Sequence, residues 1–366
     1  MQIECRQENL HRALQTVGRM VGTRGTLPVL GNILLTTEKG RLKLAATDLE
    51  IGIQTWIGGK VDKEGSLTIP ARLLSEFVST NTDPIITLHQ EETTLQLTST
   101  HFNARIKGID AGEFPLIPTV KHQDGVVIKA NVLKEAIQQT VFATALDETR
   151  PILTGVLVII EKKTMKFVAT DSYRLAEKTI AMTSSHTPLA VIVPSRTLQE
   201  LARMLPDSES EVHLYLAENQ ILFTFGETEY ISRLIDGTFP DYEQIIPKEP
   251  TTTLTLEKNT CIQAMKMASF FARESANNVQ LSVADGTIKV TAISPQLGDT
   301  VSHLEGNVSG EAIEIAFNAK FLLDALSIFP GTTLQFFLSG KFQAGVLRPI
   351  ETHDYLYLIM PLRLEN

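Results

Sequence analysis

The chain has 366 residues, of which 43% are hydrophobic and 20% are charged, and a formal net charge of −9. This composition is typical of a globular protein of two or three domains. Because it has no apolar run of ~18 residues, no signal-peptide core and only the isolated cysteines Cys5 and Cys261, we expect a cytoplasmic protein without membrane anchor, disulfides or zinc site.

In chain order, the first third begins with a short strand over residues 1–5 and a helix with apolar residues at helical spacing from Leu10 to Val21. Two alternating runs around Lys39-Gly40 predict a hairpin, and a second helix begins at Pro70. Alternation then predicts strands over residues 85–88, 94–98 and 103–109.

The same order of elements follows twice more, in units that we call modules. Three segments lie 124 residues apart, and each joins an apolar strand end to a helix start and a cation: residues 67–77, 191–201 and 315–325. In the second module we predict a first helix over 131–143 and a hairpin of 155–161 with 165–171. In the third module we predict a first helix over 259–272, a hairpin of 278–283 with 287–292 and a late strand over 341–348. Equal spacing of this kind indicates three copies of one fold.

The predicted fold class is therefore α+β, with three tandem modules that each pack two helices on antiparallel sheet. Proline and charged residues replace the periodic pattern between modules. We place the modules at residues 1–120, 125–248 and 251–366.

The net acidity hides an uneven distribution of charge. The windows between Glu8 and Glu38 and between Glu257 and Glu274 have no acid and together carry +6, so the rest carries −15. Both windows fall on the first helix of a module, and the second helices also carry cations. These helices predict a positive face for sequence-independent contact with phosphates, although a solvated helix face remains the alternative. Its cations are Arg72, Lys134, Arg196, Lys258, Lys266 and Lys320, besides Arg12.

Catalytic motifs for nucleotide, acyl or metal chemistry are absent from the sequence, which predicts a protein that is not an enzyme and needs no cofactor or metal. Asp48 and Asp171 occupy equivalent positions, where the third module has Ser294, and a turn role explains them better than a catalytic dyad. Arg174 and Glu177 are interpreted as an exposed ion pair. A hydrolase that uses Asp171 is the least supported alternative.

The C-terminal segment 358–362 is unusually apolar for a chain end. It is either a buried edge strand or part of a groove in which Met and Leu contact a partner peptide.

Four segments, together with the threefold repeat, resemble the bacterial sliding clamp, the β subunit of DNA polymerase III. They are TLPVLGN at residues 26–32, ATDSYRL at 169–175, TFPDY at 238–242 and MPLRL at 360–364. The resemblance covers the whole chain. It implies a head-to-tail homodimer that forms a closed ring, with helices lining a central hole around double-stranded DNA. The ring is then expected to tether the polymerase α subunit, clamp-loader subunits and other proteins with a clamp-binding motif.

The resemblance also implies functional residues. DNA-contacting loop positions match at Arg24 and Arg150. A partner-peptide pocket matches at Leu153, Thr170, Ser172, Tyr173, Arg174, Leu175, Pro240, Ile245, Asn318, Phe321, Phe342, Met360, Pro361, Leu362 and Arg363. Ser172, Gln244, Phe321 and Leu362 depart from the residues common in the family, which alters the expected detail of the pocket.

The implied dimer seam joins the first module of one chain to the third module of the other. The adjacent Phe270 and Phe271 end a helix and cannot easily both face one core, and Ile106 is their expected apolar partner. The alternative is that both phenylalanines belong to the core. A peptide-binding scaffold that does not encircle DNA is the main competing function.

Overall fold

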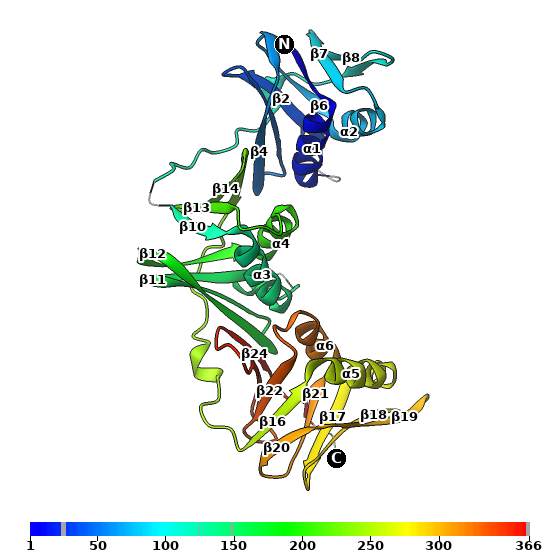
Figure 1. Cartoon of the computed structure of the whole chain (residues 1–366), viewed down its shortest axis with the longest axis vertical. Coiled ribbons are helices and arrows are strands. Elements are labelled where there is room, and N and C mark those ends of the chain that lie inside the picture. Colours follow the sequence, from blue (N-terminus) through cyan, green and yellow to red (C-terminus); the bar gives the residue numbers. More distant parts are fainter. Residues whose placement is uncertain (23–26, 124, 148, 364–366) are drawn as a thin grey trace. The chain divides into compact units, whose positions relative to one another are not determined.

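The computed structural model describes residues 1–22, 27–123, 125–147 and 149–363 (Figure 1). The chain divides into two compact units, Met1–Asn131 with Glu200–Leu234, and Val132–Gln199 with Ile235–Asn366. None of the helices in the described ranges is long and apolar enough to cross a membrane.

The first module lies in the first unit, and its described residues form two α-helices and nine strands besides short 3-10 turns. The helices are α1 (Gln7–Val17) and α2 (Ala71–Thr80). The strands are β1 (Gln2–Arg6), β2 (Asn32–Glu38), β3 (Arg41–Thr47), β4 (Ile51–Gly58), β5 (Lys60–Lys63), β6 (Ser66–Pro70), β7 (Ile85–Glu91), β8 (Thr94–Thr98) and β9 (Asn103–Lys107). Helix α1 buries Leu10, Ala13, Leu14 and Val17, the stripe that its sequence spacing predicts.

Two antiparallel sheets organise the first unit. One has the order β5-β1-β7-β8-β9. The other has the order β10-β13-β14-β15-β4-β3-β2-β6, and its β15–β4 pair joins strands of the middle module to the first. Its additional strands are β10 (Val126–Lys129), β13 (Glu211–Ala217), β14 (Gln220–Phe225) and β15 (Thr228–Arg233).

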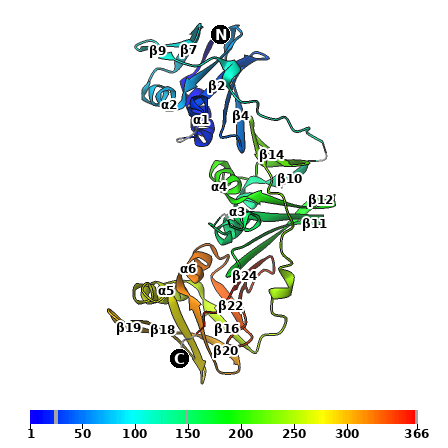
Figure 2. The same cartoon turned by 180° about the vertical axis from the view of Figure 1, so that it is seen from behind.

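The second unit also has two antiparallel sheets, with the orders β11-β12-β24-β23-β22-β16-β20 and β19-β18-β17-β21. Its helices are α3 (Ala130–Thr140), α4 (Ser195–Met204, which spans the division between the units), α5 (Lys258–Ala272) and α6 (Ala319–Ile328). Its strands are β11 (Gly155–Thr170), β12 (Arg174–Pro194), β16 (Thr252–Glu257), β17 (Asn278–Ala284), β18 (Thr287–Ser294), β19 (Gly298–Leu304), β20 (Gly306–Gly310), β21 (Ile313–Asn318), β22 (Thr333–Leu338), β23 (Gly345–Pro349) and β24 (Tyr355–Ile359). Figure 2 labels α5 and α6 beside strands of this unit.

The structure confirms the α+β class and the first and third hairpins, β2–β3 and β17–β18. The middle hairpin differs, because β11 continues as one strand from Gly155 to Thr170 with register shifts around Lys162. The predicted strand over 341–348 begins too early, since β23 starts at Gly345. Helix α3 ends at Thr140, and a 3-10 turn covers Val141–Ala143.

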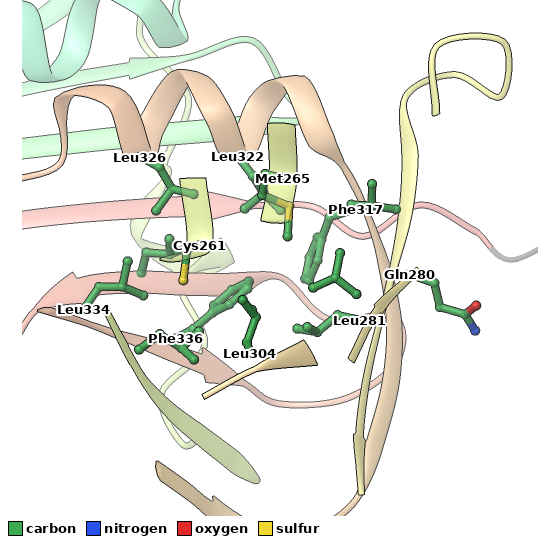
Figure 3. A pocket seen from close by; sticks show the side chains of 14 residues that line it. Cys261, Met265, Gln280, Leu281, Leu304, Phe317, Leu322, Leu326, Leu334 and Phe336 are labelled. Atoms are coloured by element: carbon green, nitrogen blue, oxygen red, sulfur yellow. The ribbon is translucent and has the colours of Figure 1, made fainter. Parts of the chain in front are cut away.

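The core of the third module encloses a small apolar cavity of about 30 Å³ between α5, α6 and the sheet strands (Figure 3). Leucine, phenylalanine, Met265 and Cys261 side chains surround it, whereas the Gln280 side chain points away. An apolar cavity offers no hydrogen-bond partners to hold water. Burial raises the pKa of the Cys261 thiol to about 12, so this cysteine acts as an apolar core residue.

Gly108 is required where the chain crosses β6. A Cβ atom at this position would lie 2.1 Å from the carbonyl oxygen of Thr68. We expect Gly108→Ala to lower the free energy of unfolding by about 1–3 kcal/mol, the typical cost of overpacking. Gly58→Ala is the matched control, since a Cβ atom there meets nothing within 4 Å. Urea titration of both variants checks this, and equal midpoints would contradict it.

Candidate functional site

The turn between β11 and β12 is built by a Thr-Asp pair. Asp171 Oδ1 accepts the N–H groups of Tyr173 at 2.9 Å and Arg174 at 3.0 Å, and the Thr170 hydroxyl donates to the Arg174 carbonyl at 2.7 Å. Ser172 has φ 77°, a left-handed conformation that favours glycine. The side chain of Ser172 therefore stands in a backbone position that disfavours any Cβ atom.

The predicted turn role of Asp48 and Asp171 is confirmed, and Ser294 has the same role in the third module. Asp48 Oδ1 accepts the N–H groups of Glu50 and Ile51, and Ser294 Oγ accepts those of Gln296 and Leu297. These contacts explain the acidic positions structurally, because short polar side chains close turns in this way.

Arg174 is buried, with 9% of its surface exposed, at the start of β12. Its Nε donates to Asp171 Oδ2 at 3.0 Å, its Nη1 to Asp324 Oδ2 at 2.7 Å, and its Nη2 to the Phe142 carbonyl at 2.9 Å. The interpretation as an exposed pair with Glu177 is wrong, because Asp324 of α6 folds against the turn. Glu177 lies 3.8 Å from Lys166 instead.

Aromatic rings surround the guanidinium of Arg174. Its carbon lies 4.2 Å from the ring centre of Phe321 and 5.4 Å from that of Phe142, and Phe142 stacks on Tyr357 at 5.8 Å. Burial opposes the charge, but the hydrogen bond to Asp324 and the charge of Asp171 hold the pKa of Arg174 above its ordinary value. Three of its five N–H donors are therefore held by groups of its own chain.

The chain end completes this surface. Strand β24 is buried between β12 and β23, so it is not an edge strand. Beyond it, the Met360 N–H donates to the Tyr173 carbonyl at 2.8 Å and the Leu362 N–H donates to the Ala316 carbonyl at 2.8 Å. Met360 is 37% exposed. The segment is thus a buried strand that continues into an accessible apolar surface.

The structure brings together much of the predicted pocket around Arg174, and we call the set of Ser172, Tyr173, Arg174, Asn318, Phe321, Met360 and Leu362 the Arg174 surface. Hydrogen bonds and ring contacts connect Tyr173, Arg174, Asn318, Phe321 and Met360, directly or through Asp171. Ser172 lies in the same turn, where its N–H donates to the Thr170 hydroxyl, and Leu362 donates to the Ala316 carbonyl. Leu153, Thr170 and Leu175 are buried, Pro361 is half-buried, and Pro240, Ile245, Phe342 and Arg363 are exposed. Asn318 begins α6 by accepting the N–H groups of Lys320 and Phe321.

Two contributors to this surface were not predicted. Asp324 and Phe142 complete the surroundings of Arg174, and the sequence signal for Asp324 is the carboxylate that recurs at Glu76 and Glu200, each 124 residues from the next. Arg150, predicted as a DNA contact, donates to Ser172 Oγ at 3.1 Å and so lies beside the Arg174 surface.

The predicted DNA-contacting cations fall on helices, with differing exposure. Arg72, Arg196, Lys266 and Lys320 are exposed, and Arg72 pairs with Glu76 at 2.8 Å. Lys134 and Lys258 are half-buried, and Lys258 Nζ donates to the Phe329 carbonyl at 3.0 Å. Arg24 lies outside the described residues.

The predicted seam residues also differ. Phe270 is 53% exposed on α5, whereas Phe271 is half-buried. Ile106 is buried, with only 4% of its surface exposed, so its side chain offers little surface to a partner.

Family models for the DNA polymerase III β subunit match the N-terminal domain at residues 1–118, the central domain at 127–241 and the C-terminal domain at 243–363. The β sliding clamp of Synechococcus elongatus is 33% identical over 100% of both chains, and that of Staphylococcus aureus is 30% identical over 99% of both. Solved sliding clamps of Bacillus subtilis and Pseudomonas aeruginosa superpose with TM-scores of 0.97 and 0.96 at 28% and 29% identity, over 100% of each chain. The chain therefore belongs to the family of bacterial sliding clamps, the β subunits of DNA polymerase III.

Proposed function

We propose that the protein is a processivity factor of DNA replication that catalyses no reaction. Two chains close head to tail into a ring around duplex DNA in the cytoplasm, and the ring slides while it tethers the polymerase. The triplicated module supports this most directly, because β15–β4 and β12–β24 continue the sheet from one module to the next. The end strands β9 and β19 are available to continue it into a second chain.

Contacts with DNA need only be weak. A ring is retained by its closed topology, and loose phosphate contacts without base readout permit sliding. The exposed cations Arg72, Lys266 and Lys320 and the acidic remainder of the chain fit a basic inner and an acidic outer surface.

Partner proteins dock on the Arg174 surface through a short peptide. The Met360 and Tyr173 side chains are accessible there, and the aromatic network around Arg174 fixes the backbone beneath them. Apolar walls with few polar groups are typical of peptide sites. We propose that the polymerase α subunit, clamp-loader subunits and repair proteins share this site.

Charge reversal separates this function from a peptide-binding scaffold that does not encircle DNA. We expect Arg72→Glu with Lys266→Glu to reduce retention on circular DNA and to lower the log–log salt slope by roughly one for each cation that contacts phosphate. Lys60→Glu with Lys63→Glu, on strand β5, is the control of equal charge change. Peptide binding should be unchanged in both. Unaltered DNA retention in the first variant would favour the scaffold.

A further inference from the structure

Each module begins with a short strand that leads into its first helix: β1, β10 and β16. In each module the N–H group of the first helical residue donates to the residue just before the neighbouring strand: Gln7 to the Pro84 carbonyl at 2.9 Å, Ala130 to that of Ser210 at 2.8 Å, and Lys258 to that of Thr332 at 2.8 Å. Counting back four residues from these helix starts makes Ile3, Val126 and Leu254 equivalent, and all three are buried.

In the first and third modules this strand lies inside a sheet. Strand β1 lies between β5 and β7, and β16 lies between β20 and β22. Strand β10 pairs with β13 on one side, but on its other side no strand among the described residues pairs with it. An antiparallel strand directs its N–H and C=O groups alternately to both sides, so β10 presents backbone groups along this edge.

The middle module lacks a covering strand because it uses the corresponding part of the chain differently. The start of β12 pairs with β11 as β4 pairs with β3, and the end of β12 pairs with β11 as β6 pairs with β2. The residues in between take the place of β5 in the chain order. They remain part of β12, whose strand partners are β11 and β24.

The strands that cover the two equivalent edges show what fits there. Strands β5 and β20 have four and five residues, and both run antiparallel to the strand that they cover. Val61 lies opposite Ile3, and Val308 lies opposite Leu254. A strand that covers β10 in the same register therefore places a valine or another β-branched residue opposite Val126.

The neighbouring outward position distinguishes the middle module from the other two. Lys60 lies opposite Glu4, and Asn307 lies opposite Thr255, so polar side chains face each other there. The equivalent residue of β10 is the half-buried Val127. An apolar residue is its matching partner, because apolar cross-strand pairs stabilise a sheet.

We propose that the open edge of β10 is a second docking site, which takes up an extended segment of a partner protein as an antiparallel strand. The segment carries an apolar residue opposite Val127, followed directly by a valine or isoleucine opposite Val126. Backbone hydrogen bonds supply the affinity, and these two side chains supply the selectivity. No residue of the Arg174 surface belongs to β10 or β13, so the two sites select different peptides.

The edge is suited to a partner that binds and leaves, and not to permanent pairing between copies of the chain. Strand β10 has only four residues and ends in the exposed Lys129. Short edge strands and lysine side chains both limit edge-to-edge pairing of identical proteins. A short strand also forms few backbone hydrogen bonds, which permits release.

Hydrogen exchange tests whether the edge is open and whether a peptide covers it. In the free protein, the amide protons of β10 that do not bond to β13 should exchange about tenfold faster or more than those of β1 and β16. The probe is a peptide that copies residues 58–65 with Lys60→Ile, and an excess of it should slow this exchange about tenfold. Equal protection of the three strands without peptide would show that the chain covers its own edge. Protection that rises with protein concentration would assign the edge to a second copy, and no slowing by the peptide would exclude the site; each result would overturn the proposal.

Two changes test the strand pairing itself. Methyl groups on one set of alternate peptide nitrogens should abolish binding, and on the other set they should leave it unchanged, because only one side of the peptide pairs with β10. Val127→Glu should weaken binding of the isoleucine peptide about fivefold and strengthen binding of the peptide that keeps Lys60 by about as much, since it recreates the pair of Glu4 with Lys60. Met360→Ala with Leu362→Ala is the control and should bind both peptides unchanged. Equal binding of the two methylated peptides, or an unaltered preference of the Val127→Glu variant, would refute the strand addition.

Discussion

Replacing Met360 and Leu362 together by alanine should weaken binding of a clamp-binding peptide about a hundredfold, within the range of interface hot spots. Met360 is accessible beyond β24, and Leu362 is held beside it by the bond from its N–H to the Ala316 carbonyl. Alanine keeps these backbone bonds but removes the apolar side chains. Titration of a fluorescent peptide from the polymerase subunit measures the change.

The matched control changes an exposed methionine and leucine elsewhere, Met267→Ala with Leu73→Ala. Its peptide affinity should equal that of the unaltered chain. Sedimentation should find the same dimer in both variants, because no residue of the Arg174 surface belongs to β9 or β19. Unchanged affinity in the Met360 and Leu362 variant would contradict the assignment of the peptide site.

Arg174→Ala should lower the free energy of unfolding of the second unit by about 3 kcal/mol. Loss of one partner of a buried ion pair is costly, since the other charge stays behind. Here Asp324 keeps 34% side-chain exposure, so solvent reduces the cost to the lower end of the range. Urea unfolding followed by circular dichroism gives the value.

An exposed pair provides the comparison for Arg174. Arg12 and Glu8 lie 2.8 Å apart with side chains 71% and 77% exposed. Arg12→Ala should change stability by less than about 0.5 kcal/mol. Arg174→Lys should recover only part of the loss, because a lysine cannot reach Asp171, Asp324 and the Phe142 carbonyl together. Equal stability of Arg174→Ala and Arg12→Ala would show that the hydrogen bonds from Arg174 to Asp171 and Asp324 do not stabilise the packing of the β11–β12 turn against α6.

Local patterns in the sequence predicted much of the fold. The spacing of cations and helix starts predicted three modules, and Asp48 and Asp171 predicted turns whose hydrogen bonds the structure contains. These features depend on neighbours within a few residues. The predicted hairpin of residues 155–161 with 165–171 is wrong, because β11 continues through Lys162 and Lys163 with register shifts and pairs with β12 instead.

Long-range packing could not be predicted in the same way. Arg174 is buried by Asp324 and Phe142, which lie 150 and 32 residues away in sequence. The sequence around Ile106 predicts an apolar strand residue, but the neighbouring residues do not show whether its side chain lies in the core of the module or at a dimer seam. The predicted module boundaries remain a prediction. Strands of the middle module pair with strands of both the first and the third module. The division into two compact units therefore passes through the middle module and does not coincide with the module boundaries.

The most direct test of the ring is its retention on circular DNA before and after the circle is cut. Labelled protein, placed by a clamp loader on a nicked circular plasmid, is separated from free protein by gel filtration. We predict that the label stays with the closed circle and leaves within minutes once a restriction enzyme linearises it. Retention that is the same on circular and linear DNA would contradict topological binding.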